Sequence, residues 1–268
     1  RARVRLPGIQ AVENLEDLSR AKKINYVLNL AGEPLATGRW NASRKQQFLE
    51  SRVGITKKLF EYFKGVDKPP DVLISGSAVG YYGPHCDKVL DEAAKYHESY
   101  SHHLCSEWEH SASQFSQLGV RVCYLRTGIV LGPEEGALGR MLMPFKMGLG
   151  GRIGHGKQWM PWIHIADEIA LIFHCFKRSD LSGAINASSP NPVMNRQFSQ
   201  VLGKVLARPV FFPMPSAIVR LLFGEMADEL LLTGQRAYPR KALESGFNFS
   251  YPELMPALEQ IIKGESVK

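Results

Sequence analysis

Short apolar runs alternate with longer segments of helical periodicity over the first two thirds of the chain. Parallel strands that are covered on both faces are apolar at successive positions. On this basis four buried strands are predicted, at Tyr26–Leu30, Asp71–Ser75, Val120–Leu125 and Ala184–Ala187. Helical periodicity predicts helices between them, at 41–64, 102–118 and 165–177. Asn41 is a suitable N-cap for the first of these helices, and Gly119 a suitable C-cap for the second.

Strands that alternate with helices of this length predict an α/β fold, a Rossmann-like doubly wound parallel sheet with helices on both faces. Beyond Pro190 the pattern changes to helices and loops. Helices are predicted there at 195–206, 216–223, 225–233 and 252–263. We therefore expect two domains, 1–190 and 191–268. Within the first, an excursion at about 134–164 contains GALGRMLMPFKMGLGG, which we interpret as a mobile lid or an ordinary crossover loop.

Composition narrows the class of protein. Hydrophobic residues make up 44% and charged residues 22% of the chain, as in ordinary globular proteins. No apolar run approaches the length of a membrane span, and RARVRLPGIQ has no signal-peptide core. We therefore expect a cytoplasmic protein with no membrane partner. A homo-oligomer is compatible with the sequence.

Charge and cysteine spacing exclude further classes. The net charge is +7, but the basic residues are scattered and form no nucleic-acid-binding motif. We expect no nucleic-acid partner and instead a small anionic substrate, which Arg126, Arg140, Lys146 and Arg152 could meet. The four cysteines are widely spaced and HExxH is absent, so we expect free thiols and no metal site.

Four segments follow the predicted strands, NLAGEP, SGSAVGYYG, RTGIVLGP and NASSPNP; three of them contain glycine and three contain hydroxyl side chains. In a doubly wound sheet, ligands bind beyond the carboxyl ends of the strands. Any one of these segments is explained equally well as a turn. Four in succession favour a binding site, with Gly32 allowing the backbone to approach a ligand closely.

The ordered set NLAG, SGSAVGYYG, LRTGIVLGP and GHGKQWMPWIHIAD resembles the extended short-chain dehydrogenase/reductase superfamily. Most similar is its NAD(P)-dependent epimerase/dehydratase-like "epimerase family" branch, which ends in a C-terminal domain of unknown function. Some members of that branch are labelled cell-division inhibitors. PMPSAIVRLLFGE and GQRAYPRKALESGF resemble that C-terminal part, so the resemblance covers nearly the whole chain.

The resemblance implies NAD or NADP as cofactor and assigns roles by position. It places Ser77 as the catalytic serine that binds the substrate oxygen. The implied cofactor-binding residues are Leu30, Ala31, Gly32, Ser75, Gly76, Thr127, Gly128 and Ile129. The implied substrate-binding residues are Gly154, Gly156, Gln158 and Trp162. Asp167 matches an aspartate at the start of the next helix, which we interpret as a helix cap.

Two departures from the family pattern stand out. The residues before Tyr26 contain no glycine-rich phosphate loop, and Arg3–Leu6 resemble the family's third strand. We therefore expect the first strand, first helix and second strand to be missing from this chain, which leaves the sheet exposed where they would pack. The family's Tyr-x-x-x-Lys pair is also incomplete, because Tyr100 is followed four residues later by Leu104.

A proton carrier is therefore sought among Tyr100, Tyr81 and Tyr82, with His164 as an alternative. The leading hypothesis is an NAD(P)-dependent oxidoreductase or epimerase-like enzyme acting on a small, nucleotide-linked or otherwise anionic substrate. The alternative is a dinucleotide-sensing or cell-division-related interaction protein on the same fold, without catalysis.

Overall fold

The computed structural model describes residues 8–9, 11–18, 23–133 and 136–264. A four-stranded parallel sheet in the order β1-β2-β4-β8 lies at its centre. Its strands are β1 (Tyr26–Asn29), β2 (Val72–Ala78), β4 (Arg121–Thr127) and β8 (Gly183–Ala187). The predicted α/β architecture is confirmed, and each predicted strand is present to within three residues at either end. Arg3–Leu6, compared above with a family strand, lie outside the described residues.

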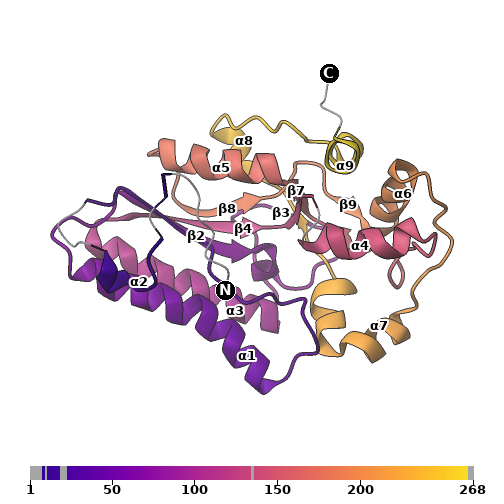
Figure 1. The fold of residues 1–268 in the computed structure, drawn as a ribbon, viewed down its shortest axis with the longest axis horizontal. Coiled ribbons are helices and arrows are strands. Elements are labelled where there is room, and N and C mark those ends of the chain that lie inside the picture. Colours follow the sequence, from indigo (N-terminus) through magenta and orange to yellow (C-terminus); the bar gives the residue numbers. More distant parts are fainter. Residues whose placement is uncertain (1–7, 10, 19–22, 134–135, 265–268) are drawn as a thin grey trace.

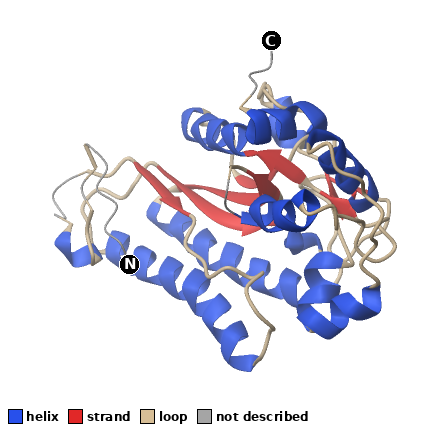
Figure 2. Cartoon of the chain, turned by 45° about the vertical axis from the view of Figure 1, so that its right-hand side comes forward, coloured by secondary structure: helices blue, strands red, loops and turns tan. Residues whose placement is uncertain are grey.

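Helices cover both faces of this sheet (Figure 1). On one face lie α1 (Ala42–Leu49), a π-helical turn (Glu50–Gly54), α2 (Ile55–Lys64), α3 (Tyr100–Ser113) and a 3-10 turn (Gln114–Leu118). On the other face lies α5 (Ile165–Lys177), with α8 (Arg240–Glu244) beside it. Figure 2 shows the sheet as a layer between the two groups of helices. One core cluster fills each interface, the first around Ile74, Leu125 and Leu171 and the second around Leu73 and Phe115.

Local capping signals place the helix ends. The side chain of Asn41 accepts a hydrogen bond from the backbone N–H of Arg44 at 2.8 Å, as expected of an N-cap. Gly119 ends the segment after α3 with a φ of +74°, where glycine carries no steric penalty. Ser99 caps α3 by accepting from His102, so this helix begins two residues before its predicted start.

The interpretation of residues 136–151 as an ordinary crossover loop is wrong for most of the segment, because Gly136–Lys146 form the helix α4. The interpretation as a mobile lid stays a prediction. Glycine and Pro144 in the segment argue against a helix locally. Leu138 and Phe145 nevertheless become buried in a cluster with Trp162 and Phe198, and this tertiary packing outweighs the weak local propensity.

The C-terminal part is mostly helical and returns to the first part at several points. Short strands pair as β5 (Ile129–Leu131) with β7 (Trp162–His164), β6 (Trp159–Met160) with β9 (Val193–Met194), and β3 (Val89–Leu90) with β10 (Arg236–Ala237). The C-terminal helices are α6 (Asn195–Val205), α7 (Ser216–Phe223) and α9 (Leu254–Lys263). Short turns lie at Leu15–Asp17 and Val79–Tyr82. The predicted helix at 225–233 is present at 225–231, as two α-helical residues followed by the π-helical segment Ala227–Leu231. The domain boundary at 190/191 stays a prediction.

One edge of the central sheet is open in the described structure. Tyr26, Leu28 and Leu30 at the β1 edge are exposed, and Ile169 and Phe173 are exposed on α5. Among the described residues, no helix combines the length and apolar character needed to cross a membrane.

Candidate active site

The carboxyl ends of β1, β2 and β4 meet at one edge of the sheet. Asn29 is in register with Ser75, and Ala78 is in register with Thr127. The segments that follow β1 and β4, together with the end of β2, therefore come together, as the strand-end motifs predict. Leu30 and Gly32 are exposed there and Thr127 to Ile129 are half-buried, whereas Ser75 to Ser77 are buried.

The glycines at these strand ends are required by the packing of the protein itself. A Cβ on Gly32 would lie 2.9 Å from the guanidinium carbon of Arg52. A Cβ on Gly76 would lie 2.6 Å from the indole of Trp108, and one on Gly128 would lie 2.6 Å from the carbonyl oxygen of Pro161. Glycine therefore lets internal groups approach the backbone here, and this requirement explains the motif without a ligand.

Ser77 belongs to a buried hydrogen-bond network. Its hydroxyl donates to Oε1 of Glu109 at 2.7 Å, and only 6% of the residue is exposed. Arg126 forms a bidentate pair with the same carboxylate, Nε to Oε1 and Nη2 to Oε2, each at 2.8 Å. Burial lowers the pKa of Arg126, but the bonds to Glu109 and the neighbouring Tyr82 outweigh it, and the pKa lies above its usual value. Because a paired carboxylate only accepts, Ser77 must be the donor in this contact.

The sequence-based expectation for Arg126 is corrected by this geometry. Only 4% of Arg126 is exposed, and its charge is used inside the protein by Glu109. The guanidinium also lies 3.4 Å from the ring centroid of Tyr81 and 5.0 Å from that of Tyr82. Arg126 therefore joins Ser77 to the adjacent tyrosines and does not form a surface site for an anion.

The three candidate tyrosines lie in different environments. The hydroxyl of Tyr82 donates to Asn186 at 2.7 Å, and burial raises its pKa to about 12. The hydroxyl of Tyr100 donates to the carbonyl of Lys45, and burial raises its pKa to about 12 as well. Tyr81 is half-buried, and its hydroxyl makes no hydrogen bond with any described residue.

Helix geometry separates Tyr100 from Ser77. Tyr100 and Glu109 are nine positions apart, about two and a half turns, so their side chains leave α3 on opposite faces. Tyr100 packs against Trp40 on the α1 side. Three residues of α3 approach the strand-end turn. The side chains of Ser101 and Cys105 lie 3.1 Å and 3.9 Å from a Cβ built on Gly80, and Nδ1 of His102 lies 2.5 Å from the carbonyl oxygen of Tyr81.

Glu109 is the functional candidate that the sequence analysis missed. The expected Tyr-x-x-x-Lys pair involves only residues at the start of this helix, Tyr100 and Leu104, and so does not include Glu109. Glu109 lies one turn beyond Cys105 on the same face, and a carboxylate on the buried face of a helix needs a partner. A charged residue on the predicted buried face of this helix therefore indicates that Glu109 has a specific partner, and this could have been read from the sequence.

The expected substrate loop is anchored to the C-terminal part. Gln158 donates to the carbonyls of Ile153 and Leu231 at 3.1 and 2.8 Å. Gly154 and Gly156 have φ of +56° and +68°, conformations that favour glycine. Trp162 is fully buried, with its indole N–H donating to Asn191. The expected substrate contacts of these four residues stay predictions.

The helix that follows β7 is capped differently from the expectation. His164, not Asp167, is the N-cap of α5, because its Nδ1 accepts from the backbone of Ala166. Its Nε2 faces Gln260 at 2.9 Å, so both ring nitrogens are engaged and His164 is poorly placed as a proton carrier. Asp167 instead accepts from the backbone amides of Ser250 and Tyr251 at 2.8 and 2.9 Å.

A second buried carboxyl group lies at the end of β4. Glu168 is 5% exposed and receives a hydrogen bond from Thr127 at 3.1 Å, while its Oε2 has no partner. Burial raises the pKa of Glu168 to about 7, against a small opposing effect of the Thr127 bond. The half-buried end of β4 thus combines the Thr127 hydroxyl with a buried carboxyl group whose pKa lies near neutrality.

Metal-ligating groups and cysteine thiols can also be compared with the sequence-based expectations. Within the described ranges no group of three or more metal-ligating side chains occurs. The four cysteines are free, as expected, with Cys86 exposed and the other three buried.

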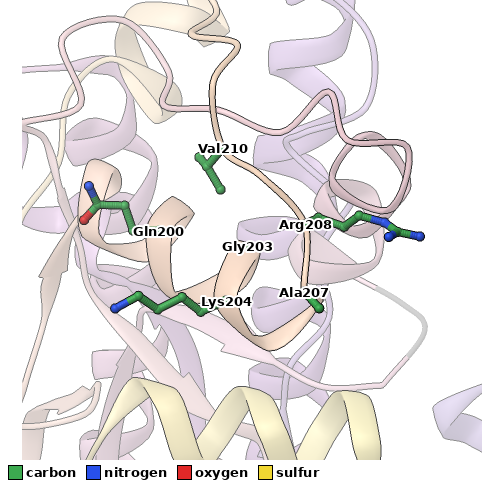
Figure 3. Close-up of a pocket in the computed structure, with 6 residues that line it drawn as sticks. All are labelled: Gln200, Gly203, Lys204, Ala207, Arg208 and Val210. Atoms are coloured by element: carbon green, nitrogen blue, oxygen red, sulfur yellow. The ribbon is translucent and has the colours of Figure 1, made fainter.

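A surface hollow of about 510 Å³ lies on the C-terminal half of α6, away from the strand ends (Figure 3). Its lining residues are Gln200, Gly203, Lys204, Ala207, Arg208 and Val210.

Comparison with protein families gives two matches. A model described as "NAD dependent epimerase/dehydratase family" matches residues 8–187, and one described as "Domain of unknown function (DUF1731)" matches residues 214–261. Among individual relatives, the epimerase family protein YfhF of Bacillus subtilis is 38% identical over 89% of this chain and 78% of its own. The chloroplastic SDR39U1 homolog of Arabidopsis thaliana is 38% identical over 96% and 74%.

Solved structures agree with these matches. Human epimerase family protein SDR39U1, crystallised with NADPH, superposes with a TM-score of 0.86 at 34% identity, over 94% of this chain and 86% of that one. A nucleoside-diphosphate sugar epimerase from Corynebacterium glutamicum gives a TM-score of 0.73 at 30% identity, over 90% and 47%.

Proposed function

This chain belongs to the NAD-dependent epimerase/dehydratase family, and from that premise we propose that it is a nicotinamide-dependent oxidoreductase or epimerase. Its substrate is a small, nucleotide-linked or otherwise anionic alcohol. The observation that carries the proposal is the Ser77–Glu109–Arg126 network, at the sheet edge where strand-end segments meet. The NADPH in the human relative and the nucleoside-diphosphate sugar named for the Corynebacterium relative support the cofactor and substrate class.

The strand-end residues fit the nicotinamide half of a dinucleotide. Exposed Leu30 and Gly32 and half-buried Thr127 combine apolar surface with a hydroxyl group beside the buried carboxyl group of Glu168. We assign cofactor contact to Leu30, Ala31, Gly32, Ser75, Gly76, Thr127, Gly128 and Ile129. When bound there, the cofactor accepts or supplies a hydride.

Ser77 determines how the reacting oxygen is held. Its proton is donated to Glu109, so its oxygen offers only lone pairs to a ligand. A substrate hydroxyl can donate to those lone pairs, whereas a carbonyl oxygen could only accept from Ser77, and only if Ser77 gave up its bond to Glu109. The site therefore binds the reacting group as an alcohol. Glu109 and Arg126 act through Ser77 and are positioning residues.

Tyr81 is the proton carrier favoured by its surroundings. Its hydroxyl is not committed to another described residue, and it follows Ser77 closely in the strand-end turn. The hydroxyl groups of Tyr82 and Tyr100 each donate a hydrogen bond to an acceptor within the protein. General acid–base catalysis by one positioned side chain accounts for about 10²- to 10⁴-fold in rate.

The experiment compares Ser77→Ala and Tyr81→Phe with Tyr100→Phe as a matched control. Net oxidation is followed by nicotinamide absorbance and epimerisation by chromatography of the sugar products, with NAD(P)+ and a panel of nucleoside-diphosphate sugars and other anionic alcohols. We expect the first two variants to lower kcat/KM by about 100-fold and Tyr100→Phe to change it little. Unchanged turnover in Ser77→Ala would exclude the proposed mechanism.

Cofactor binding is measured separately, by the change of melting temperature with NADPH concentration. If NADPH raises the melting temperature while no substrate of the panel turns over, the dinucleotide-sensing alternative is favoured. If neither occurs, both functions are rejected for this chain.

A further inference from the structure

Half of the large hydrophobic side chains exposed in the described structure lie in two segments, 143–149 and 211–222. They form what we call the apolar strip: Met143, Met147, Leu149, Phe211, Phe212, Met214, Ile218, Leu221 and Leu222. Phe211 is 77% and Met143 65% exposed. Single exposed apolar residues are normal on protein surfaces, but a contiguous group marks an interaction site.

The two segments are joined by hydrogen bonds. The backbone N–H of Phe212 donates to the carbonyl of Gly150 at 3.4 Å, and that of Met214 donates to Arg152 at 2.9 Å. The Nε of Arg208 donates to the carbonyl of Lys146 at 3.0 Å. In Figure 1 the connection from α6 to α7 runs down the right-hand edge of the molecule, beside α4. The strip is therefore one surface.

The outer face of α7 continues this surface. Ile218, Leu221 and Leu222 are spaced three and four residues apart, so they share one face of the helix, and all three are exposed. Val219 is the buried residue of this helix. Helix α7 thus presents its broader apolar side to the outside.

Charge is distributed unevenly around the strip. Residues 136–166 and 188–224 contain eight Lys and Arg and no Asp or Glu. The rest of the chain has 25 Lys and Arg against 26 Asp and Glu, so the whole net charge of +7 arises from these two segments. The preceding acidic residues, Glu134 and Glu135, lie outside the described ones.

Most of these cations are not neutralised by carboxylates in the described structure. Arg208 and Arg152 donate to backbone carbonyls, and Lys204 and Lys146 are exposed. Arg220 is the exception, because it pairs with Asp228. The hollow on α6 brings Lys204 and Arg208 to opposite sides of its rim, with Val210 between the two arms (Figure 3). Positive charge therefore flanks the apolar side chains.

We propose that the apolar strip docks on an anionic membrane surface, with its Met, Phe and Leu side chains inserted among the acyl chains and its cations at the headgroups. Peripheral helices bind membranes through this combination of apolar and basic residues. A second copy of the chain is a poor occupant, because it would bring two segments of net positive charge together. The expectation of no membrane partner rests on the lack of a membrane-crossing segment, which does not exclude binding at the membrane surface.

Sedimentation with vesicles tests the proposal. The full chain is mixed with vesicles of phosphatidylcholine, with or without phosphatidylglycerol, at low and high salt. We expect binding to the anionic vesicles that weakens as salt rises. Phe211→Ser with Phe212→Ser should reduce binding at least about tenfold. Lys204→Glu with Arg208→Glu should do the same, since each cation near an anionic surface contributes about fivefold.

Phe173→Ser is the matched control, because Phe173 is exposed on α5 outside the strip and its loss should leave binding unchanged. Circular dichroism and thermal melting confirm that each variant is folded. Equal binding to both vesicle types, or full binding by the Phe211/Phe212 variant, would overturn the proposal. So would a concentration-dependent dimer that these two substitutions abolish, which would assign the strip to a second copy. The test does not depend on the proposed enzymatic function.

Discussion

At the scale of single residues, buried carboxyl groups distinguish this site. Glu109 is held as a carboxylate by Arg126, whereas Glu168 has only the hydroxyl of Thr127 as partner. The Thr127 hydroxyl also lies 3.3 Å from the carbonyl of Leu125 and cannot donate to both oxygens. A protonated Glu168 can donate to Thr127, which then donates to Leu125. The same residue type therefore serves as an anion in one place and as a neutral acid in the other.

The protonation of Glu168 leads to a pH prediction. Its pKa is about 7 in the folded protein and 4.5 in a free chain. The stabilisation that comes from its protonated form is therefore fully present below pH 4.5 and lost as the pH rises to 7 and above. Glu168→Gln should remove this loss. At pH 8 its free energy of unfolding should therefore exceed that of the unmodified protein by up to roughly 3 kcal/mol. Urea unfolding at pH 4.5 and pH 8 measures the difference.

Glu244→Gln serves as the control, because Glu244 is exposed on α8 and its substitution should shift stability equally at both pH values. A Glu168→Gln protein whose gain is the same at pH 4.5 and pH 8 would contradict the assignment.

The residues of the site were only partly predictable from the sequence. Ser77 and Thr127 could be placed because strand ends are determined by local apolar runs. Glu109 and Arg126 could not, because their partnership joins a helix to a strand across a tertiary contact. Tyr100 stays a predicted proton carrier, but it leaves α3 on the face opposite Glu109, because nine positions turn the side-chain direction by about 180°.

At the scale of elements, close backbone approaches constrain the strand-end turn. Gly83 has φ of +68°, and a Cβ there would lie 2.0 Å from the carbonyl oxygen of His97. Gly119 has a similar φ of +74°, but a Cβ there would meet nothing within 4 Å. The two glycines share a positive φ, but they differ in ψ, −166° at Gly83 and 11° at Gly119, and in their surroundings.

This pair gives a matched prediction. Gly119→Ala should cost about 1–2 kcal/mol, for the left-handed conformation alone. Gly83→Ala should cost a further 1–3 kcal/mol or more, because the backbone near His97 must move. Thermal or urea unfolding of both variants measures the difference. Equal destabilisation would show that the turn relaxes freely.

Elements with local signals were predicted well, and those stabilised by tertiary packing were not. Helix α5 and helix α7 were predicted to the residue, since their apolar periodicity is strong. Helix α4 was missed, because glycine and Pro144 mask its periodicity and burial of Leu138 and Phe145 stabilises it.

At the scale of the whole molecule, α5 connects the sheet to the C-terminal segment. Asp167 accepts the amides of Ser250 and Tyr251, and His164 contacts Gln260 and stacks on Tyr251 at 4.0 Å. Charge-assisted bonds of this kind contribute roughly 1.5–3 kcal/mol each. These contacts hold the segment before α9 against the start of α5.

Asp167→Ala should therefore loosen the C-terminal segment more than the sheet. We expect faster amide hydrogen exchange at residues 250–263, with β2 and β4 little changed, and a loss of about 2–4 kcal/mol in unfolding free energy. Asp180→Ala is the control, because Asp180 is exposed and pairs only with Arg178. Uniform acceleration across the sheet would argue that Asp167 stabilises the whole fold rather than this junction.

The accessibility of the thiols makes the protein convenient to label. Cys86 is exposed, whereas Cys105, Cys123 and Cys175 are buried, and burial raises the pKa of Cys105 to about 12. A maleimide dye should therefore attach at one place without any mutagenesis. Cys86 lies between His85 and Asp87 in the chain. His85 forms an isolated β-bridge with Gly234, and the carboxylate of Asp87 accepts a hydrogen bond from the indole N–H of Trp159. A fluorophore there would report in real time whether the strand-end turn and the C-terminal part move relative to each other when a ligand binds.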